Sequence, residues 1–193
     1  MTLILASSSA IRRQMLDAAG VGYQAIPSNV DEAHAKARLT APEEIALALA
    51  RAKAIDVSNG HSAATVIGSD SVASVEGRLF DKPKDRNQAV EHLRFFSGKA
   101  MTLTSAVAIA RKSVVEWGHV EVARLQVRAL SEPFIQTYLD AEWPEVGYCV
   151  GVFRMEGRGV QLFDRIDGEY FTILGMPLLP LLGALRERGL LPS

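Results

Sequence analysis

The chain has 193 residues, of which 48% are hydrophobic and 22% are charged, and its formal net charge at pH 7 is −1. This composition is typical of a globular protein with a buried core. The near-zero charge excludes the broad basic surface on which nucleic-acid binding depends. We therefore expect one domain over residues 1–193, a length within the usual range for a single domain.

Neither a secretory signal nor a membrane span is expected. The chain becomes polar directly after Ala6, too early for a signal peptide, and the apolar stretch 173–185 is interrupted by Gly175, Pro177 and Pro180. The single cysteine, Cys149, excludes an internal disulfide and fits a reducing compartment. No histidine stands near it to activate a catalytic thiol. We expect a cytoplasmic protein without a membrane or nucleic-acid partner.

The first predicted unit is a strand that turns into a helix. Leu3–Ala6 is an apolar run typical of a buried strand, and Ser7–Ser9 can cap a helix that ends near Gly20. A helix start of this kind presents free N–H groups and a positive dipole end. Two arginines in its first turn, Arg12 and Arg13, oppose that dipole, and a bound phosphate would explain them. An ordinary surface pair beside a serine cap is the alternative, and the spacing does not decide between them.

The rest of the pattern predicts a mixed α/β fold with antiparallel portions. In chain order we expect a strand at 23–26, a polar loop at 27–34, a helix from a capping box at 40–43 to about 57, a strand at 64–68 that ends at 69–71, a hairpin around 76–77, an extended segment at 81–84, a helix from 85 to 98, paired strands at 101–110 and 114–125, and helices at 131–141 and 177–189.

Asp70 is the strongest single candidate for chemistry. It follows an apolar strand and lies between Ser69 and Ser71, in the kind of place where open α/β sheets bind ligands. A carboxylate there can bind a divalent cation or accept a proton from water. An aspartate that only caps a turn is equally compatible with the spacing.

Candidate phosphate ligands are spread along the chain. Lys82 and Lys84 flank Pro83 and should leave an extended segment on the same side. Lys53 follows Leu49 by one helical turn and should face the apolar side, where it needs an anion partner unless it snorkels to solvent. With the two arginines these lysines supply five positive charges, against about four negative charges on a nucleoside triphosphate.

The remaining titratable residues suggest a magnesium site rather than a zinc site. Glu32 and Glu156 complete the candidate carboxylates, and magnesium takes one or two carboxylates with phosphate oxygens and water. The four histidines, at positions 34, 61, 92 and 119, show no ligand spacing and are interpreted as structural or surface residues.

Several ordered segments together resemble the Maf family of nucleoside triphosphate pyrophosphatases over nearly the whole length. They are LILASSSAIRRQML, NVDE, LARAKA, IGSDSV, FDKPKD, FSGKAMTLTSAVAI and the C-terminal run from VGVFRMEGRG to LLGALRERG. The resemblance implies a mixed, twisted sheet flanked by helices, with a deep cleft, as in Maf and inosine triphosphatase-like proteins. It also implies a homodimer and a reaction that depends on a divalent metal, Mg²⁺ or Mn²⁺.

The resemblance also implies roles for particular residues. Asp70 takes the position of the general base, and Asp70 and Glu32 are the expected metal ligands. The expected phosphate-binding positions are Ser8, Arg12, Arg13, Lys53 and Lys82. Three further positions are expected to govern substrate specificity: Ile11, Ser71 and Glu156.

Within the family the chain is similar to the branch that hydrolyses 7-methyl-GTP. Arg154-Met155-Glu156-Gly157 stands where the dTTP/UTP branch has Gly-Ile-Gln-Gly. A carboxylate can accept hydrogen bonds from guanine, and its charge complements the cationic methylated ring. Phe153 or another aromatic residue could stack on that ring.

Two departures bear on the base more than on the reaction. Ser71 replaces the threonine or glutamine of the two branches, and Ala10-Ile11 replaces a proline–aromatic pair. The alternatives that stay open are a dTTP/UTP pyrophosphatase of the same family and a nucleotide-binding regulator of cell division. Release of pyrophosphate separates the enzymes from the regulator.

Overall fold

The computed structural model describes residues 2–192, apart from the side chains of residues 34, 35 and 37. It contains strands β1 (Leu3–Leu5), β2 (Gln24–Ala25), β3 (Thr65–Val75), β4 (Arg78–Phe80), β5 (Ala100–Arg111), β6 (Val114–Val127) and β7 (Phe163–Asp167). The α-helices are α1 (Ala10–Ala18), α2 (Glu32–Arg38), α3 (Pro42–Gly60), α4 (Arg86–Phe96), α5 (Glu132–Glu142), α6 (Tyr170–Ile173) and α7 (Leu178–Glu187), and η1 (Glu145–Tyr148) and η2 (Arg158–Leu162) are 3₁₀ helices.

The chain forms two compact units, and strands β3, β5 and β6 each contribute residues to both. The first unit comprises Met1–Ser71, Thr104–Glu121 and Glu169–Ser193, and the second comprises Val72–Leu103 and Val122–Gly168. In the first unit the strand order is β2-β1-β3-β5-β6, and β1 is parallel to both β2 and β3. In the second, β4 pairs antiparallel with β3, and β7 pairs antiparallel with β6. The predicted mixed α/β sheet flanked by helices is confirmed.

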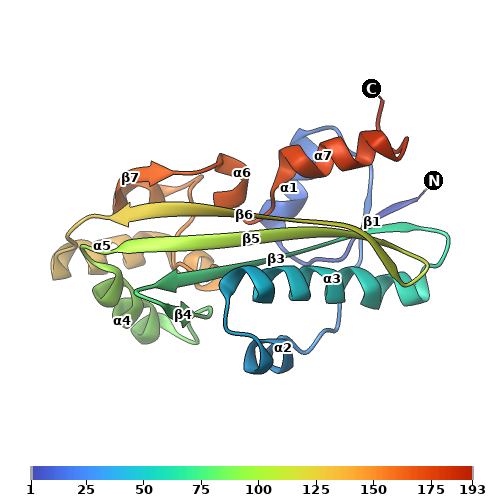
Figure 1. Ribbon diagram of the computed structural model, residues 1–193. Helices are drawn as coiled ribbons and strands as arrows, with labels where there is room; N and C mark the ends of the chain where they lie inside the picture. The colour runs from blue at the N-terminus through green and yellow to red at the C-terminus, as the bar shows by residue number, and fades with distance from the viewer. Residues whose placement is uncertain (1, 193) are drawn as a thin grey trace. The chain divides into compact units, whose positions relative to one another are not determined.

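The first unit has helices on both faces of its strands, as Figure 1 shows. Because side chains alternate along a strand, Leu3, Leu5 and Ile67 face one cluster while Ile4 and Val66 face the other. The first cluster also holds Met15 and Leu16 of α1 together with Leu178, Leu181 and Leu185 of α7. The second holds Ala54 and Val57 of α3. Burial of these apolar faces places α3 on the opposite side of the strands from α1 and α7.

Several local signals act as predicted. Ser9 caps α1, Asp85 caps α4 through the Gln88 N–H, and Ser131 caps α5. The two-residue link between β5 and β6 has positive φ at both Lys112 and Ser113, as a tight hairpin requires.

Three expectations are wrong. Residues 32–34 belong to α2 rather than to a loop, because Asp31 caps the helix by accepting from the Ala33 N–H. Thr40 forms no capping box: Ala41 is the cap residue and makes no side-chain hydrogen bond, and Pro42 begins α3 instead. The strand predicted to end at 69–71 continues to Val75, because Val72, Ala73 and Val75 are buried and residues 73–75 pair with β4.

Among the described residues, no helix is both long and apolar enough to cross a membrane.

Candidate active site

The site in the first unit is set by the close approach of α3 to β3. Gly68 touches the α3 backbone: a Cβ at this position would lie 2.1 Å from the Ala50 carbonyl oxygen and 2.6 Å from the Ala54 nitrogen. Only glycine allows this contact. Lys53 lies in the same turn of α3. Because Gly68 has no side chain, α3 packs close enough to β3 for the Lys53 ammonium to reach Asp70, two residues after Gly68.

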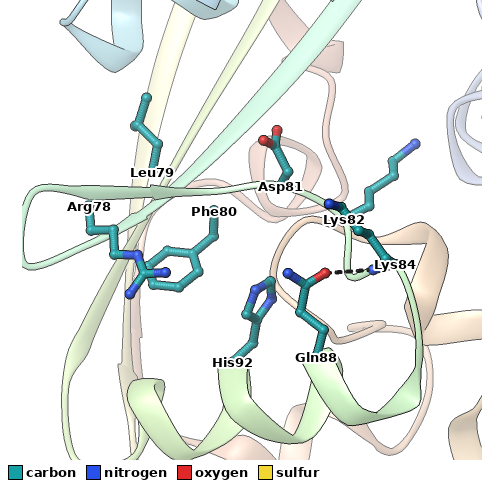
Figure 2. Close-up of a pocket in the computed structure, with 8 residues that line it drawn as sticks. All are labelled: Arg78, Leu79, Phe80, Asp81, Lys82, Lys84, Gln88 and His92. Carbon is teal, nitrogen blue, oxygen red and sulfur yellow. Dashed lines mark hydrogen bonds between the residues drawn. The ribbon is translucent and has the colours of Figure 1, made fainter. Parts of the chain in front are cut away.

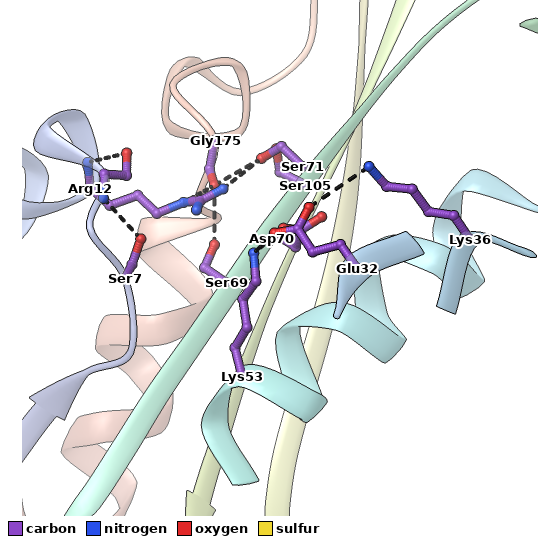
Figure 3. Close-up of polar contacts among 11 residues, drawn as sticks. Ser7, Arg12, Glu32, Lys36, Lys53, Ser69, Asp70, Ser71, Ser105 and Gly175 are labelled. Carbon is purple, nitrogen blue, oxygen red and sulfur yellow. Dashed lines mark hydrogen bonds and ion pairs between the residues drawn. The ribbon is translucent and has the colours of Figure 1, made fainter. Parts of the chain in front are cut away.

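Lys53 joins two carboxylates. Its Nζ lies 2.6 Å from Asp70 Oδ1 and 2.7 Å from Glu32 Oε1, as Figure 3 shows. The side chains of Lys53 and Asp70 are only 12% and 8% exposed, so neither charge is well solvated and each needs the other. Glu32 is more exposed and also pairs with Lys36 at 3.7 Å. The expectation that Lys53 faces inward toward an anion is confirmed.

Arg12 is held by hydrogen bonds in one orientation. Its Nε donates to the Gly175 carbonyl at 2.9 Å, and its Nη2 donates to Ser71 Oγ at 3.1 Å. Burial lowers the pKa of Arg12, while the nearby carboxylates of Asp70 and Glu32 raise it. Guanidinium has five N–H donors, so up to three of them can bind an anion in this fixed geometry.

Alternation along β3 distributes these contacts over both faces of the strand. Asp70 faces α3 and Lys53, whereas Ser69 and Ser71 face Gly175: Ser69 Oγ donates to the Gly175 carbonyl at 3.1 Å, and Ser71 Oγ lies 3.0 Å from the same oxygen. The parallel neighbour β1 pairs with β3 only as far as Ile67. Residues 69–71 therefore extend past the end of β1, which is why a residue inside a strand can serve a site.

The charges of this cluster cancel. Arg12 and Lys53 contribute two positive charges, and Glu32 and Asp70 contribute two negative ones. The Lys53 ammonium, expected from the sequence to bind phosphate, is paired with two carboxylates in this structure, and its role toward phosphate stays a prediction. A triphosphate with roughly four negative charges needs further cations here.

Other predicted residues of the first unit lie at its surface. Ser8 and Arg13 are exposed, and Ile11 is half-buried at the start of α1. Ser9 rather than Ser8 caps the helix, and Ser7 Oγ accepts from the Ser9 N–H at 3.2 Å. Of the two arginines, the structure thus ties only Arg12 to the cluster around Asp70.

Two predicted residues belong to the second unit. Lys82 lines an open pocket of about 270 Å³ together with Lys84, Arg78 and His92, and Figure 2 shows both lysines at the same end of it. Glu156 forms an ion pair with Arg154, from Nε to Oε1, at 3.2 Å.

Phe153 does not act as the expected stacking residue. It is 6% exposed and packs edge-on against Phe163, with the ring centroids 4.8 Å apart. Its ring is part of the core of the second unit, so no face of it is free to receive a base.

The donor set around Asp70 fits a divalent cation that shares its coordination with a substrate. Asp70 and Glu32 converge on one cation position, now taken by the Lys53 ammonium. No group of three or more His, Cys, Asp or Glu residues suited to a metal occurs among the described residues. Magnesium bound by one or two carboxylates and by phosphate oxygens matches such a pair, whereas a fully protein-ligated metal does not.

Sequence reasoning missed four members of the site. Ser69 and Gly175 contact one another, and Ser105 Oγ lies 2.9 Å from Ser71 Oγ and donates to the Thr172 carbonyl at 2.8 Å. For Gly175 the available sequence signal is a glycine shortly before Pro177, and the structure shows that it has a positive φ of +103°, which favours glycine. Nothing in the local pattern around Ser105 or Thr172 distinguishes them from ordinary core residues.

Comparison with known proteins gives consistent results over the whole chain. Residues 2–188 match the family described as Maf-like protein. A 7-methyl-GTP pyrophosphatase of Rhizobium meliloti is 46% identical over 191 residues, which cover 97% of this chain and 96% of that protein. A nucleoside triphosphate pyrophosphatase of Rhodopseudomonas palustris is 45% identical and covers 98% and 95%. The solved structure of the Staphylococcus aureus Ham1 protein shares the fold, with a TM-score of 0.51, 15% identity and coverage of 98% and 100%.

Proposed function

This chain belongs to the Maf family, and on that premise we propose that it hydrolyses a nucleoside triphosphate to the nucleoside monophosphate and pyrophosphate. The observation that carries the proposal is a cluster in which the Lys53 ammonium lies within 2.7 Å of both the Asp70 and the Glu32 carboxylates. Arg12 lies beside this cluster in an orientation held by hydrogen bonds. A buried carboxylate, a lysine and an oriented guanidinium are the groups that phosphoryl chemistry needs.

In the proposed reaction, water attacks the α-phosphorus. The new bond forms between the water oxygen and phosphorus, and the bond to the bridging oxygen breaks, so that pyrophosphate leaves with that electron pair. Asp70 orients the water and accepts its proton. Arg12 binds phosphate oxygens through its remaining N–H groups, and we propose the same role for Ser8, Arg13, Lys53 and Lys82.

We expect a divalent cation, Mg²⁺ or Mn²⁺, to be bound by Asp70 and Glu32. When bound, such an ion lowers the pKa of its water and neutralises phosphate charge. This second effect is the one that the cluster requires, since its own charges cancel. The ion would then take the cation position between the two carboxylates that the Lys53 ammonium now occupies, and the substrate would supply the remaining ligands.

Among substrates, we propose 7-methyl-GTP. The relative from Rhizobium meliloti bears that name, and Glu156 supplies a carboxylate where a glutamine would mark the dTTP/UTP branch. Ser71 and Ile11 are the other positions that we expect to affect the choice of base. We also expect a homodimer, as the family resemblance implies, and a cytoplasmic location, as the single cysteine and the lack of a predicted signal peptide indicate.

The test is pyrophosphate release from 7-methyl-GTP, GTP, UTP and dTTP with Mg²⁺ or Mn²⁺ present. We expect the highest kcat/KM for 7-methyl-GTP. A preference for UTP or dTTP would keep the reaction and reject the base, and no release from any of the four would reject the reaction. Asp70→Asn should lower kcat at least 100-fold, whereas Asp17→Asn, on the exposed side of α1, should retain it.

The role of Glu156 has its own test. Glu156→Gln removes the negative charge with little change in shape, so it should lower kcat/KM for 7-methyl-GTP about 10-fold and that for GTP less. Equal losses on both substrates would show that Glu156 does not read the methylated ring.

A further inference from the structure

We propose that Ser105 is a positioning residue that fixes Arg12 through Ser71. The proposal rests on the proposed function in one respect, namely that Arg12 binds the triphosphate. Ser105 lies on β5, fully buried, and its Oγ is 2.9 Å from Ser71 Oγ. Ser71 Oγ is in turn 3.1 Å from Arg12 Nη2.

The single protons of the Ser71 and Ser105 hydroxyls determine which of the two donates in each hydrogen bond. Ser105 Oγ donates its only proton to the Thr172 carbonyl at 2.8 Å, so it can only accept from Ser71. Ser71 also lies 3.0 Å from the Gly175 carbonyl, but that oxygen already accepts from Arg12 Nε and from Ser69 Oγ. A carbonyl oxygen has two lone pairs, so the Ser71 proton is best used toward Ser105.

With this assignment, each side chain in the series donates one hydrogen bond to the next member. Arg12 donates to Ser71, Ser71 to Ser105, and Ser105 to the Thr172 carbonyl. Chains of hydrogen bonds that share one direction polarise and strengthen each other in a buried site. Ser71 thereby presents its lone pair to the guanidinium and keeps its proton away from it.

Thr172, the last member of this series of hydrogen bonds, is itself held in place. Thr172 is buried in α6, and its Oγ1 donates to Glu121 Oε2 on β6. Glu121 Oε1 in turn contacts His119 Nε2 at 3.1 Å. The same α6 segment leads to Gly175, whose carbonyl binds Arg12 Nε. Both acceptors of Arg12 thus depend on one segment, and Ser105 binds that segment to β5.

This arrangement assigns Ser71 a different role from reading a base directly. Its hydroxyl contacts Arg12, Ser105 and the Gly175 carbonyl. A change at this position therefore affects the substrate by moving Arg12.

The chain offers a matched control beside Ser105. Thr104 is the preceding residue of β5 and is equally buried, but its Oγ1 has no hydrogen-bond partner among the described residues. Thr104→Val removes a buried hydroxyl of β5 that positions nothing. Ser105→Ala removes the one that connects Ser71 to Thr172.

The experiment measures kcat and KM for pyrophosphate release, together with the Kd of inorganic tripolyphosphate. We expect Ser105→Ala to lower kcat/KM about 10-fold and to weaken tripolyphosphate binding in proportion, while Thr104→Val stays within about twofold of the wild type. In an Arg12→Lys background Ser105→Ala should change either quantity less than about twofold, because lysine cannot make both contacts of the guanidinium. Ser105→Cys keeps the volume and weakens the donor, so it should show the same loss if Ser105→Ala fails to fold.

Two results would overturn the proposal: wild-type kinetics and binding in both Ser105 variants, or an equal loss with and without Arg12. If the wild-type protein releases no pyrophosphate at all, the proposed function fails by itself. The tripolyphosphate affinities of the same variants then still decide whether Ser105 acts through Arg12.

Discussion

Gly68→Ala tests whether the contact between α3 and β3 places Lys53 at Asp70. The new Cβ would lie 2.1 Å from the Ala50 carbonyl oxygen, whereas carbon and oxygen ordinarily approach to roughly 3.3 Å. Both partners are backbone, so α3 must move away by roughly 1.2 Å. The Lys53–Asp70 distance of 2.6 Å would then exceed the range of a hydrogen bond.

We expect two measurable effects. Overpacking of this kind costs about 1–3 kcal/mol in the free energy of unfolding, which urea denaturation measures. Displacement of a catalytic group by about 1 Å costs roughly 100-fold in rate, which pyrophosphate release measures. Gly183→Ala is the control, because that glycine lies inside α7 with nothing within 4 Å of an added Cβ. The free energy of unfolding of this variant should rise by about 0.5–1 kcal/mol, and its activity should be unchanged. Wild-type stability and activity in Gly68→Ala would refute the reasoning.

Three further predictions concern a metal, a histidine and the cysteine. Lys53→Met removes the ammonium that lies between the two carboxylates, so millimolar Mg²⁺ should raise the Tm of this variant more than that of the wild type; an equal shift would contradict a cation site there. Burial, with a smaller effect of Arg78, lowers the pKa of His92 below its ordinary 6.5. Its contribution to stability is therefore complete above pH 6.5 and is lost as the pH falls below it; urea denaturation from pH 7.5 to 5 should show a decline that His92→Gln reduces and that the exposed His61→Gln does not. Burial raises the pKa of Cys149 to about 11, so iodoacetamide should modify it slowly at pH 8, and Cys149→Ser should retain activity; rapid modification would show that the thiolate is accessible.

The base-specific part of the proposal depends on residues whose surroundings differ from those of Asp70. Glu156 already has a partner in Arg154, and Phe153 is buried.

The sequence by itself determined the local structure and the family. Strand Leu3–Leu5, the serine cap of α1 and the caps at Asp85 and Ser131 depend on residues within a few positions of one another, and so they can be predicted from spacing. The ordered motifs predicted the family, which the match over residues 2–188 confirms. The prediction that the chain is a single domain with a deep cleft stays a prediction.

Only the tertiary structure decided which charges meet. Lys53 and Asp70 are 17 residues apart, and Arg12 reaches Gly175 across 163 residues. Spacing cannot show that Lys53 is bound by two carboxylates, because that depends on how closely α3 can approach Gly68. The extension of β3 past Asp70 likewise depends on pairing with β4. Long-range packing, which carries no local pattern, thus determined the charge balance of the site and the residues that hold Arg12.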